Sequence, residues 1–247
     1  FSKVKCLNCN QNSFNFKKAN SNDLDKIHIF IFERISDDLD DIENEIRKIR
    51  NDPPKGQIIV IDNFYNNPME TRNYILTQEF KVRGNYPGQR TKSFATLDLK
   101  NSIEKYISQI AGKITEWPME NDNDVVYNGS FQYTTSRDRS WIHNDGVNNW
   151  AGVCYLTPDA PVSSGTGFYK FVDGTRNSIE AEKRLNVDII NKNSQDLTKW
   201  ELVDSIGNIF NRIILFNSKN YHMSQDYFGT DKYNGRLFQV FFFSTEY

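Results

Sequence analysis

The spacing of apolar residues changes along the chain, and the change falls near Tyr127. Before that point, predicted strands alternate with predicted helices. In 36–52, Leu39, Ile42, Ile46 and Ile49 recur at the spacing of one helical face. We expect further helices at 68–79 and 97–114, and strands at 27–35 and 57–64.

After Tyr127 the chain becomes a series of short apolar runs separated by turn-forming residues. Many short strands punctuated by turns are typical of a sandwich, a jelly roll or a barrel. We therefore predict a mainly β fold with flanking helices. The predicted strands are 128–134, 139–143, 150–157, 166–171, 200–204, 208–216, 220–223 and 235–244.

One segment interrupts this β pattern. Residues 172–199 are charged and lack strand alternation, and we expect helix near 179–191. We interpret the segment as an insertion, with the hypothesis that it forms a lid. The chain then divides into an N-terminal arm, strand and helix at 1–56 and a domain at 57–247, whose β core is expected at about 127–247.

Composition narrows the possible classes of function. The net charge of −2 provides no general attraction to nucleic acid or to an anionic membrane. No run of 18 apolar residues is present, so we expect no membrane span. We find no signal peptide and expect a cytoplasmic protein, although the chain begins at Phe1 rather than Met. The sequence does not indicate an oligomeric state.

The three cysteines suggest little chemistry. Cys6 and Cys9 form a C-x-x-C pair, but a four-ligand zinc site needs two further ligands and the sequence has no second pair. Cys154 lies in an apolar run and is expected to be a buried small side chain.

The candidate chemistry lies in the β half, which holds two of the three histidines. His143 and Asp145 form an H-x-D, and residues two apart in a strand point to the same side. His222 follows 79 residues later, after an apolar run. Two imidazoles and one carboxylate on one face make the facial triad of non-haem Fe(II) oxygenases, with coordination positions left open. The ordinary alternative is hydrogen-bonded structural histidines and a turn aspartate.

A cation follows at a position that suggests a ligand. Arg236 opens the aromatic strand RLFQVFFF, fourteen residues after His222. A buried cation needs a partner, and the planar guanidinium suits a carboxylate such as the distal one of 2-oxoglutarate. The alternative is a surface cation at the start of a strand.

From about Tyr127 to the end, the chain resembles the 2-oxoglutarate/Fe(II)-dependent dioxygenases, in the style of their prolyl 4-hydroxylase-like branch. The N-terminal half is similar to a little-characterised branch found in microbial, viral and algal-type sequences. The matching segments, in chain order, are Phe131-Gln132-Tyr133, Trp141 to Asp145, Tyr155-Leu156-Thr157, Ser164 to Phe168, Ile213 to Phe216 with His222, and Arg236.

The resemblance implies a double-stranded β-helix (a jelly-roll or cupin-like core) with Fe(II), 2-oxoglutarate and O₂ as reactants. It implies that Tyr133 contacts the 2-oxoglutarate carboxylate, and Tyr155, on a neighbouring strand, is a second candidate. Two departures concern the substrate: Arg236 stands where many prolyl hydroxylases use Lys, and the 172–199 insertion is long.

We therefore expect an enzyme that activates a C–H bond of a small amino-acid-like molecule, by hydroxylation or by oxidative cyclisation or desaturation. Candidate residues for a substrate carboxylate are Arg90, Arg137, Arg139 and Arg176, which are otherwise solvated surface residues. The alternatives are a peptidyl prolyl-type hydroxylase, a cupin-like metalloenzyme without 2-oxoglutarate, and a non-catalytic β-sandwich binding module.

Overall fold

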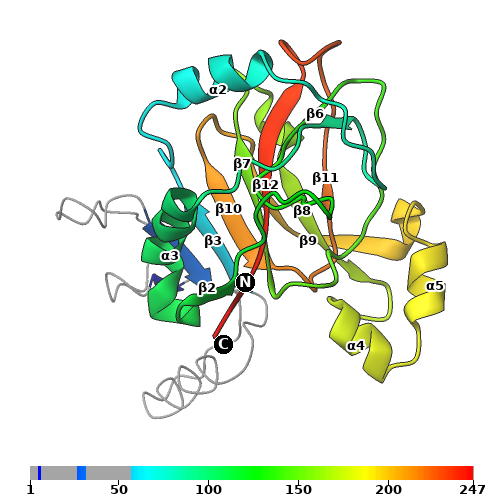
Figure 1. The fold of residues 1–247 in the computed structure, drawn as a ribbon. Helices are drawn as coiled ribbons and strands as arrows, with labels where there is room; N and C mark the ends of the chain where they lie inside the picture. The colour runs from blue at the N-terminus through cyan, green and yellow to red at the C-terminus, as the bar shows by residue number, and fades with distance from the viewer. Residues whose placement is uncertain (1–4, 7–26, 32–56, 247) are drawn as a thin grey trace.

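The computed structural model describes residues 5–6, 27–31 and 57–246 (Figure 1). The predicted helix at 36–52 and Cys9 lie outside these residues, as do the side chains of Cys6 and His28. Strands are present where two further N-terminal strands were predicted, at 27–31 and 57–61.

The larger of two β-sheets is built entirely from antiparallel neighbours. Its strand order is β1-β2-β3-β10-β7-β12-β6-β4, and β5 pairs with the end of β12. The strands are β1 (Lys5–Cys6), β2 (Ile27–Ile31), β3 (Gln57–Ile61), β4 (Gln89–Arg90), β5 (Ile114–Glu116), β6 (Phe131–Thr134), β7 (Trp150–Tyr155), β10 (Ile213–Asn217) and β12 (Arg236–Thr245). Because β3 pairs with β10, the β core begins before residue 127.

The second sheet has the order β11-β8-β9 and faces one side of the large sheet. It consists of β8 (Thr166–Phe171), β9 (Trp200–Ile206) and β11 (His222–Ser224). The chain passes repeatedly between the two sheets, and the fold is mainly β with a double-stranded β-helix core, as predicted. The helices α2 (Pro68–Leu76) and α3 (Leu97–Ala111) flank the large sheet.

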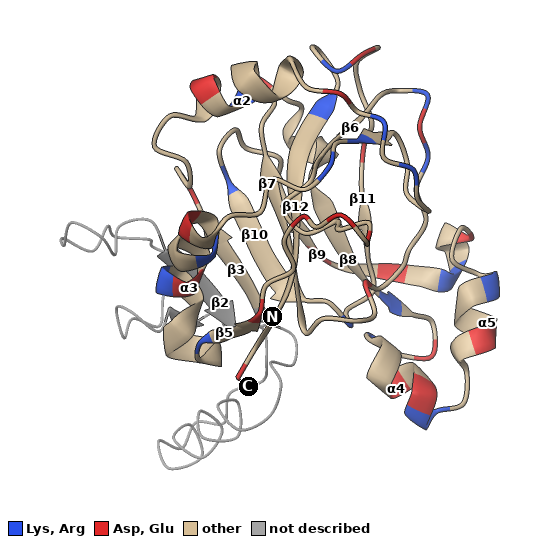
Figure 2. Ribbon diagram, in the orientation of Figure 1, with Lys and Arg blue, Asp and Glu red and all other residues tan. Residues whose placement is uncertain are grey.

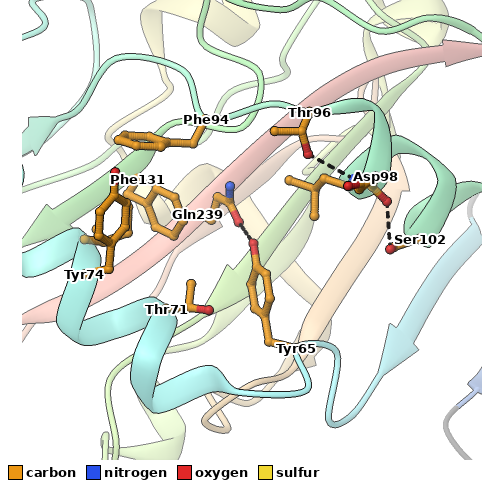
Figure 3. A pocket seen from close by; sticks show the side chains of 11 residues that line it. Tyr65, Thr71, Tyr74, Phe94, Thr96, Asp98, Ser102, Phe131 and Gln239 are labelled. Carbon is orange, nitrogen blue, oxygen red and sulfur yellow. Dashed lines mark hydrogen bonds between the residues drawn. The ribbon is translucent and has the colours of Figure 1, made fainter.

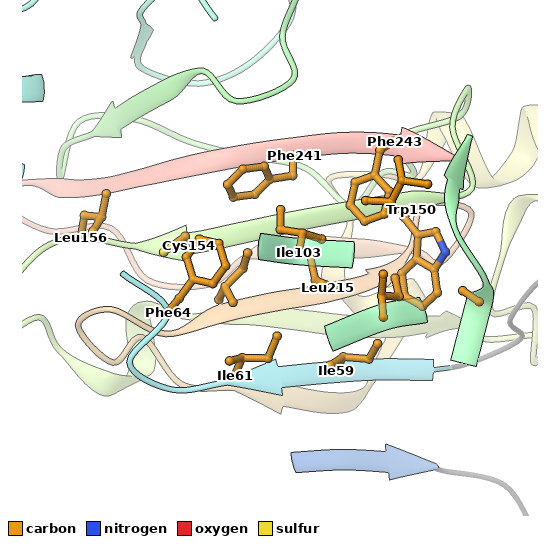
Figure 4. Packing of buried hydrophobic residues seen from close by; sticks show 14 of the residues in the cluster. Ile59, Ile61, Phe64, Ile103, Trp150, Cys154, Leu156, Leu215, Phe241 and Phe243 are labelled. Atoms are coloured by element: carbon orange, nitrogen blue, oxygen red, sulfur yellow. The ribbon is translucent and has the colours of Figure 1, made fainter. Parts of the chain in front are cut away.

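Side-chain alternation along β7 and β12 divides the interior into two layers. Trp150 and Phe241 belong to the cluster between the large sheet and the helices, together with Ile103 of α3 (Figure 4). Ala151 and Val240, one residue away in each strand, face the second sheet. Full burial of an aromatic or branched side chain contributes about 1.5–3 kcal/mol to folding. A one-residue slip in strand register would lose this burial, so the register of β7 and β12 is strongly favoured.

Close packing of the central strands requires a glycine in β7. A Cβ on Gly152 would lie 2.7 Å from Leu215 Cδ2 and 3.0 Å from the Ile214 carbonyl oxygen. Cys154, two residues on, is fully buried, as expected, and burial raises the pKa of its thiol.

Several predicted boundaries shift for local reasons. The helix at 97–114 ends at Ala111, because Gly112 adopts a φ of +73°. The strand at 208–216 begins only at Ile213, since Asn211 has a φ of +63° and its side chain bonds to the backbone of Tyr65. The predicted strand at 139–143 is instead extended chain with a single β-bridge between His143 and His222.

The 172–199 segment contains helix near 179–191, as predicted. It contains α4 (Ser178–Lys183) and α5 (Val187–Lys192), with the 3₁₀ turn Leu197–Lys199 before β9. Both helices carry acidic and basic residues (Figure 2). Among the helices that the structure describes, none is both long and apolar enough to cross a bilayer.

Candidate metal centre

His143, Asp145 and His222 are brought together by backbone pairing. The amide of His143 donates to the carbonyl of His222 at 3.0 Å, and the amide of His222 donates back at 2.9 Å. The amide of Asp145 donates to the carbonyl of Ser218, which anchors the next turn of the H-x-D segment beside the strand that leads to His222. The register between two distant segments thus sets the spacing of the three side chains.

The three side chains form a compact donor set. One ligand atom from each residue lies within 4.8 Å of the others. Asp145 lies close to both imidazoles. Its Oδ1 lies 3.7 Å from His143 Nε2 and its Oδ2 lies 3.2 Å from His222 Nε2. Two imidazole nitrogens and a carboxylate suit a divalent transition metal such as Fe(II).

Both imidazoles are oriented by the same local contact. The Nδ1 group of His143 lies 2.9 Å from the Trp141 carbonyl, and that of His222 lies 2.9 Å from the Asn220 carbonyl. Each carbonyl belongs to the residue two positions earlier. A proton on Nδ1 satisfies it, which leaves the Nε2 lone pair of each ring directed towards the donor set.

The three groups influence one another electrostatically. Burial, together with the charge of His222, lowers the pKa of His143. Burial alone would also lower the pKa of His222, but the charge of Asp145 and its hydrogen bond outweigh burial and raise it. Burial alone would raise the pKa of Asp145, yet His222, His143 and Arg90 together lower it. The carboxylate is therefore ionised and ready to bind a cation.

These ligands open into a cavity of about 80 Å³ between the two sheets. Its walls come from β6, β7, β8, β10, β11 and β12 and from the chain segments 86–90 and 140–145. Its apolar lining is Val153, Phe216, Phe238, Val240 and Phe242, and its polar lining includes Arg90, Gln132, Ser140, Thr166 and Ser224. The two sheets would shield a metal in this position from bulk water.

Arg236 lies beside this cavity and has one unsatisfied group. It is fully buried, its Nε donates to the Ser164 carbonyl at 2.7 Å, and its guanidinium lies 4.3 Å from the ring of Phe238, which lines the cavity. Its Nη1 has no hydrogen-bond partner among the described residues. A buried cation with a free donor fits an anionic ligand that is absent from the chain itself.

Two other buried polar atoms without partners belong to the same neighbourhood, and sequence reasoning missed both. Thr134 lies directly opposite Arg236 in the β6–β12 register, and its Oγ1 is unsatisfied. The hydroxyl of Tyr227 also has no partner among the described residues, and Tyr227 lies close enough to Arg236 to interact with it electrostatically. Thr134 could have been found from strand alternation, because it stands two residues after Gln132, whereas no sequence signal marks Tyr227.

The two tyrosines expected at the co-substrate site are placed differently. Tyr155 faces the second sheet: its ring lies 5.3 Å from the Arg236 guanidinium and its hydroxyl bonds Thr166 Oγ1 at 2.8 Å. Tyr133 lies on the opposite face of the large sheet and packs edge-on against Phe80 at 5.1 Å. The structure does not bring Tyr133 to the cavity, because strand alternation directs its neighbour Gln132 there instead.

The four candidate arginines also separate. Arg90 is buried and lines the cavity. Arg137, Arg139 and Arg176 are exposed and are not among the residues that line it. Arg139, for example, donates to the carbonyls of Ser136 and Asp138 within its own loop.

The 172–199 insertion lies behind the metal ligands. Ala181 and Ile190 pack in one cluster with Ile142 and Tyr221, the residues that immediately precede His143 and His222. The Ile142 amide also donates to the Ser194 carbonyl at 2.9 Å. No residue of 172–199 lines the cavity, and the contacts shown by the structure are those of a support behind the ligand segments, so the lid stays a prediction.

A larger cavity of about 350 Å³ lies on the helical face of the large sheet (Figure 3). Tyr65 donates to Gln239 Oε1 there, and Phe94, Phe131 and Asp98 contribute to the lining. The group of three candidate metal ligands found in the described chain is not part of it. Size alone therefore does not identify the functional site.

Fold and site together define a double-stranded β-helix protein with a two-histidine, one-carboxylate centre beside a buried arginine. The sequence pattern of one protein family, described as a family of unknown function (DUF6445), matches residues 43–243. The chain belongs to this family. No curated protein matches the sequence.

Solved structures with a similar chain trace include two kinds of protein. HygX from Streptomyces hygroscopicus, with nickel and 2-oxoglutarate bound, is 11% identical with a TM-score of 0.47, over 77% of this chain and 83% of that one. A Trichoplax adhaerens prolyl hydroxylase, in complex with a hypoxia inducible factor peptide fragment, is 14% identical with a TM-score of 0.45, over 84% and 94%. A Pseudomonas putida prolyl-4-hydroxylase is 11% identical with a TM-score of 0.40, over 77% and 93%.

Proposed function

We propose that this protein is an Fe(II)- and 2-oxoglutarate-dependent oxygenase that oxidises a C–H bond of a small amino-acid-like molecule. Hydroxylation, oxidative cyclisation and desaturation are all within this chemistry. The observation that carries the proposal is that Nη1 of fully buried Arg236, beside the cavity that holds His143, Asp145 and His222, has no partner in the part of the chain that the structure describes.

His143, Asp145 and His222 would hold the iron. Their Nε2 and carboxylate atoms supply three donors on one side, so the remaining positions of an octahedral ion would face the cavity. The carbonyls of Trp141 and Asn220 keep both rings in the tautomer that a metal requires.

Arg236 would hold the distal carboxylate of 2-oxoglutarate. An ion pair with that carboxylate would satisfy Nη1 and compensate a guanidinium that has 0% exposed surface. The hydroxyls of Thr134 and Tyr227 can donate to the same anion, and Tyr155 keeps the wall in place through Thr166.

Once iron and 2-oxoglutarate are bound, they supply the O₂ activation that oxidises the substrate and yields succinate and CO₂. The chain's own contribution is binding, orientation and exclusion of water. Val153, Phe216, Phe238, Val240 and Phe242 make the apolar walls that exclude water from the reacting centre.

The test is an anaerobic titration of metal-free protein with Fe(II) and then 2-oxoglutarate, following the weak visible charge-transfer band. We expect the band in wild type, its loss in His222→Ala, and a 2-oxoglutarate affinity at least about tenfold weaker in Arg236→Gln. Arg139→Gln, which removes an exposed arginine, is the matched control and should behave as wild type.

Iron binding in Arg236→Gln, measured separately, checks that the variant is folded. If folded, iron-loaded wild type gave no band with 2-oxoglutarate, the oxygenase proposal would be wrong, and a metal enzyme without 2-oxoglutarate or a binding module would be favoured. If Arg236→Gln bound 2-oxoglutarate as tightly as wild type, Arg236 would not be the carboxylate anchor.

A further inference from the structure

A second buried arginine, Arg90, lines the cavity beside which Arg236 lies. It lies in β4, pairs with Gln132 of β6 and is only 6% exposed. Its Nε donates to Gln132 Oε1 at 2.9 Å, and its Nη2 donates to the same oxygen. Gln132 Nε2 donates to the Pro87 carbonyl at 2.6 Å, which fixes the amide.

Aromatic rings hold the guanidinium of Arg90 in place. Its central carbon lies 3.7 Å from the centre of the Tyr86 ring and 5.0 Å from that of Tyr127. The two rings pack edge to face with each other. A guanidinium fixed by stacking and by two hydrogen bonds to one amide oxygen is pre-organised to present its remaining donors to a ligand.

Arg90 has no anionic partner in the described chain. Asp145 is the acid whose charge acts on it, but the two do not form an ion pair, and the carboxylate of Asp145 is directed to His143 and His222. The hydrogen bonds that Arg90 makes to described residues use its Nε and Nη2 and leave Nη1 out. Burial lowers the pKa of Arg90 to about 10, so it remains a cation at neutral pH.

Charge balance in the loaded site leaves Arg90 as the remaining cation. The two charges of Fe(II) would be balanced by Asp145 and by the carboxylate of 2-oxoglutarate at its keto-acid end. Arg236 would be balanced by the distal carboxylate. One buried positive charge is then left, and buried charges in proteins are compensated.

We propose that Arg90 is the anchor for a single carboxylate of the oxidised substrate, with Tyr86 and Gln132 as its positioning residues. This inference rests on the proposed function and narrows its substrate to a small molecule with one carboxylate near the reacting carbon. The apolar walls of the cavity suit an aliphatic remainder. A phosphate, with nearly two charges, would exceed the single charge left to compensate.

The test uses acetate as the carboxylate probe and acetamide as its neutral counterpart, added to the anaerobic Fe(II)–2-oxoglutarate complex. Binding is measured by the paramagnetic relaxation of the probe's methyl protons. We expect acetate to bind wild type and acetamide to bind at least about tenfold more weakly, since a charge-assisted bond is lost. Arg90→Gln should weaken acetate to the level of acetamide, and Arg139→Gln should change nothing.

Gln132→Glu gives an independent check that keeps Arg90 in place. The new carboxylate would pair with Arg90 internally and should abolish acetate binding. The charge-transfer band must persist in both Arg90→Gln and Gln132→Glu, which verifies that the iron and 2-oxoglutarate sites are intact.

The outcomes separate this inference from the function on which it rests. Absence of the band in wild type would overturn the proposed function. A normal band with acetate binding that survives in Arg90→Gln would overturn the assignment of Arg90 alone. If Arg90→Gln weakened 2-oxoglutarate as much as Arg236→Gln does, Arg90 would serve the co-substrate and the assignment would also be wrong.

Discussion

Single side chains at the site are set by which face of a strand they occupy. Gln132 lines the cavity and Thr134 lies opposite Arg236, whereas Tyr133 between them packs against Phe80 on the other face. One residue of register therefore separates a group that can touch a ligand from one that supports the helical layer. Tyr227, which no motif marks, reaches the neighbourhood of Arg236 from a loop.

We predict that one of two tyrosine substitutions weakens 2-oxoglutarate binding and that the other leaves it unchanged. Tyr227→Phe should weaken 2-oxoglutarate binding about two- to tenfold, because it removes one hydrogen bond to the distal carboxylate. Tyr133→Phe, its matched control, should leave the affinity unchanged, since its ring faces away from the cavity. Calorimetric titration of the iron-loaded protein measures both, and an effect of Tyr133→Phe larger than that of Tyr227→Phe would contradict the placement.

At the scale of elements, the helices α4 and α5 support the ligand segments from outside the second sheet. Ile142 and Tyr221, each next to a histidine ligand, pack with Ile190 and Trp200. Movement of this cluster would shift both imidazoles, so the insertion and the metal centre are mechanically connected. This contact gives 172–199 a supporting role, whereas the lid remains a prediction.

Ile190 and Ile189 offer a matched pair for testing this connection. Ile190 is 1% exposed and Ile189 is 55% exposed. We expect Ile190→Ala to cost about 2–5 kcal/mol of unfolding free energy and to raise the iron dissociation constant. Ile189→Ala should alter neither by a measurable amount. Denaturant unfolding and competitive metal titration provide the readouts, and unchanged iron affinity in a destabilised Ile190→Ala would show that the helices support stability alone.

For the whole molecule, ligand binding and stability are coupled. Ligands that bind the folded state alone stabilise it, by about 2.7 kcal/mol at a hundred times Kd. For a chain of this size, each kcal/mol raises Tm by roughly 2–4 °C. The metal-free protein and the ligand-loaded protein should therefore have measurably different Tm values.

We predict that Fe(II) raises Tm under anaerobic conditions, that 2-oxoglutarate raises it further only when metal is present, and that a chelator reverses both shifts. In Arg236→Gln the metal shift should remain and the 2-oxoglutarate shift should shrink. Differential scanning calorimetry measures these quantities. A 2-oxoglutarate shift of full size in metal-free protein would mean that it binds elsewhere.

The sequence by itself determined the β class, most strand positions, the two helices that flank the large sheet and the H-x-D with a later histidine. These features depend on local spacing: alternation, helical periodicity and residues two apart in an extended chain. The double-stranded β-helix was expected from the resemblance of the C-terminal half, and the observed sheets confirm it.

Only the tertiary structure decided which of the candidate residues meet. The antiparallel bridge between His143 and His222 joins segments 79 residues apart, and strand pairing sets Thr134 opposite Arg236. The same pairing buried Arg90 in the cavity while Arg137, Arg139 and Arg176 stayed exposed. No local sequence pattern encodes the long-range register of strand pairing. For this physical reason the sequence predicted candidate residues but not which of them are neighbours in the fold.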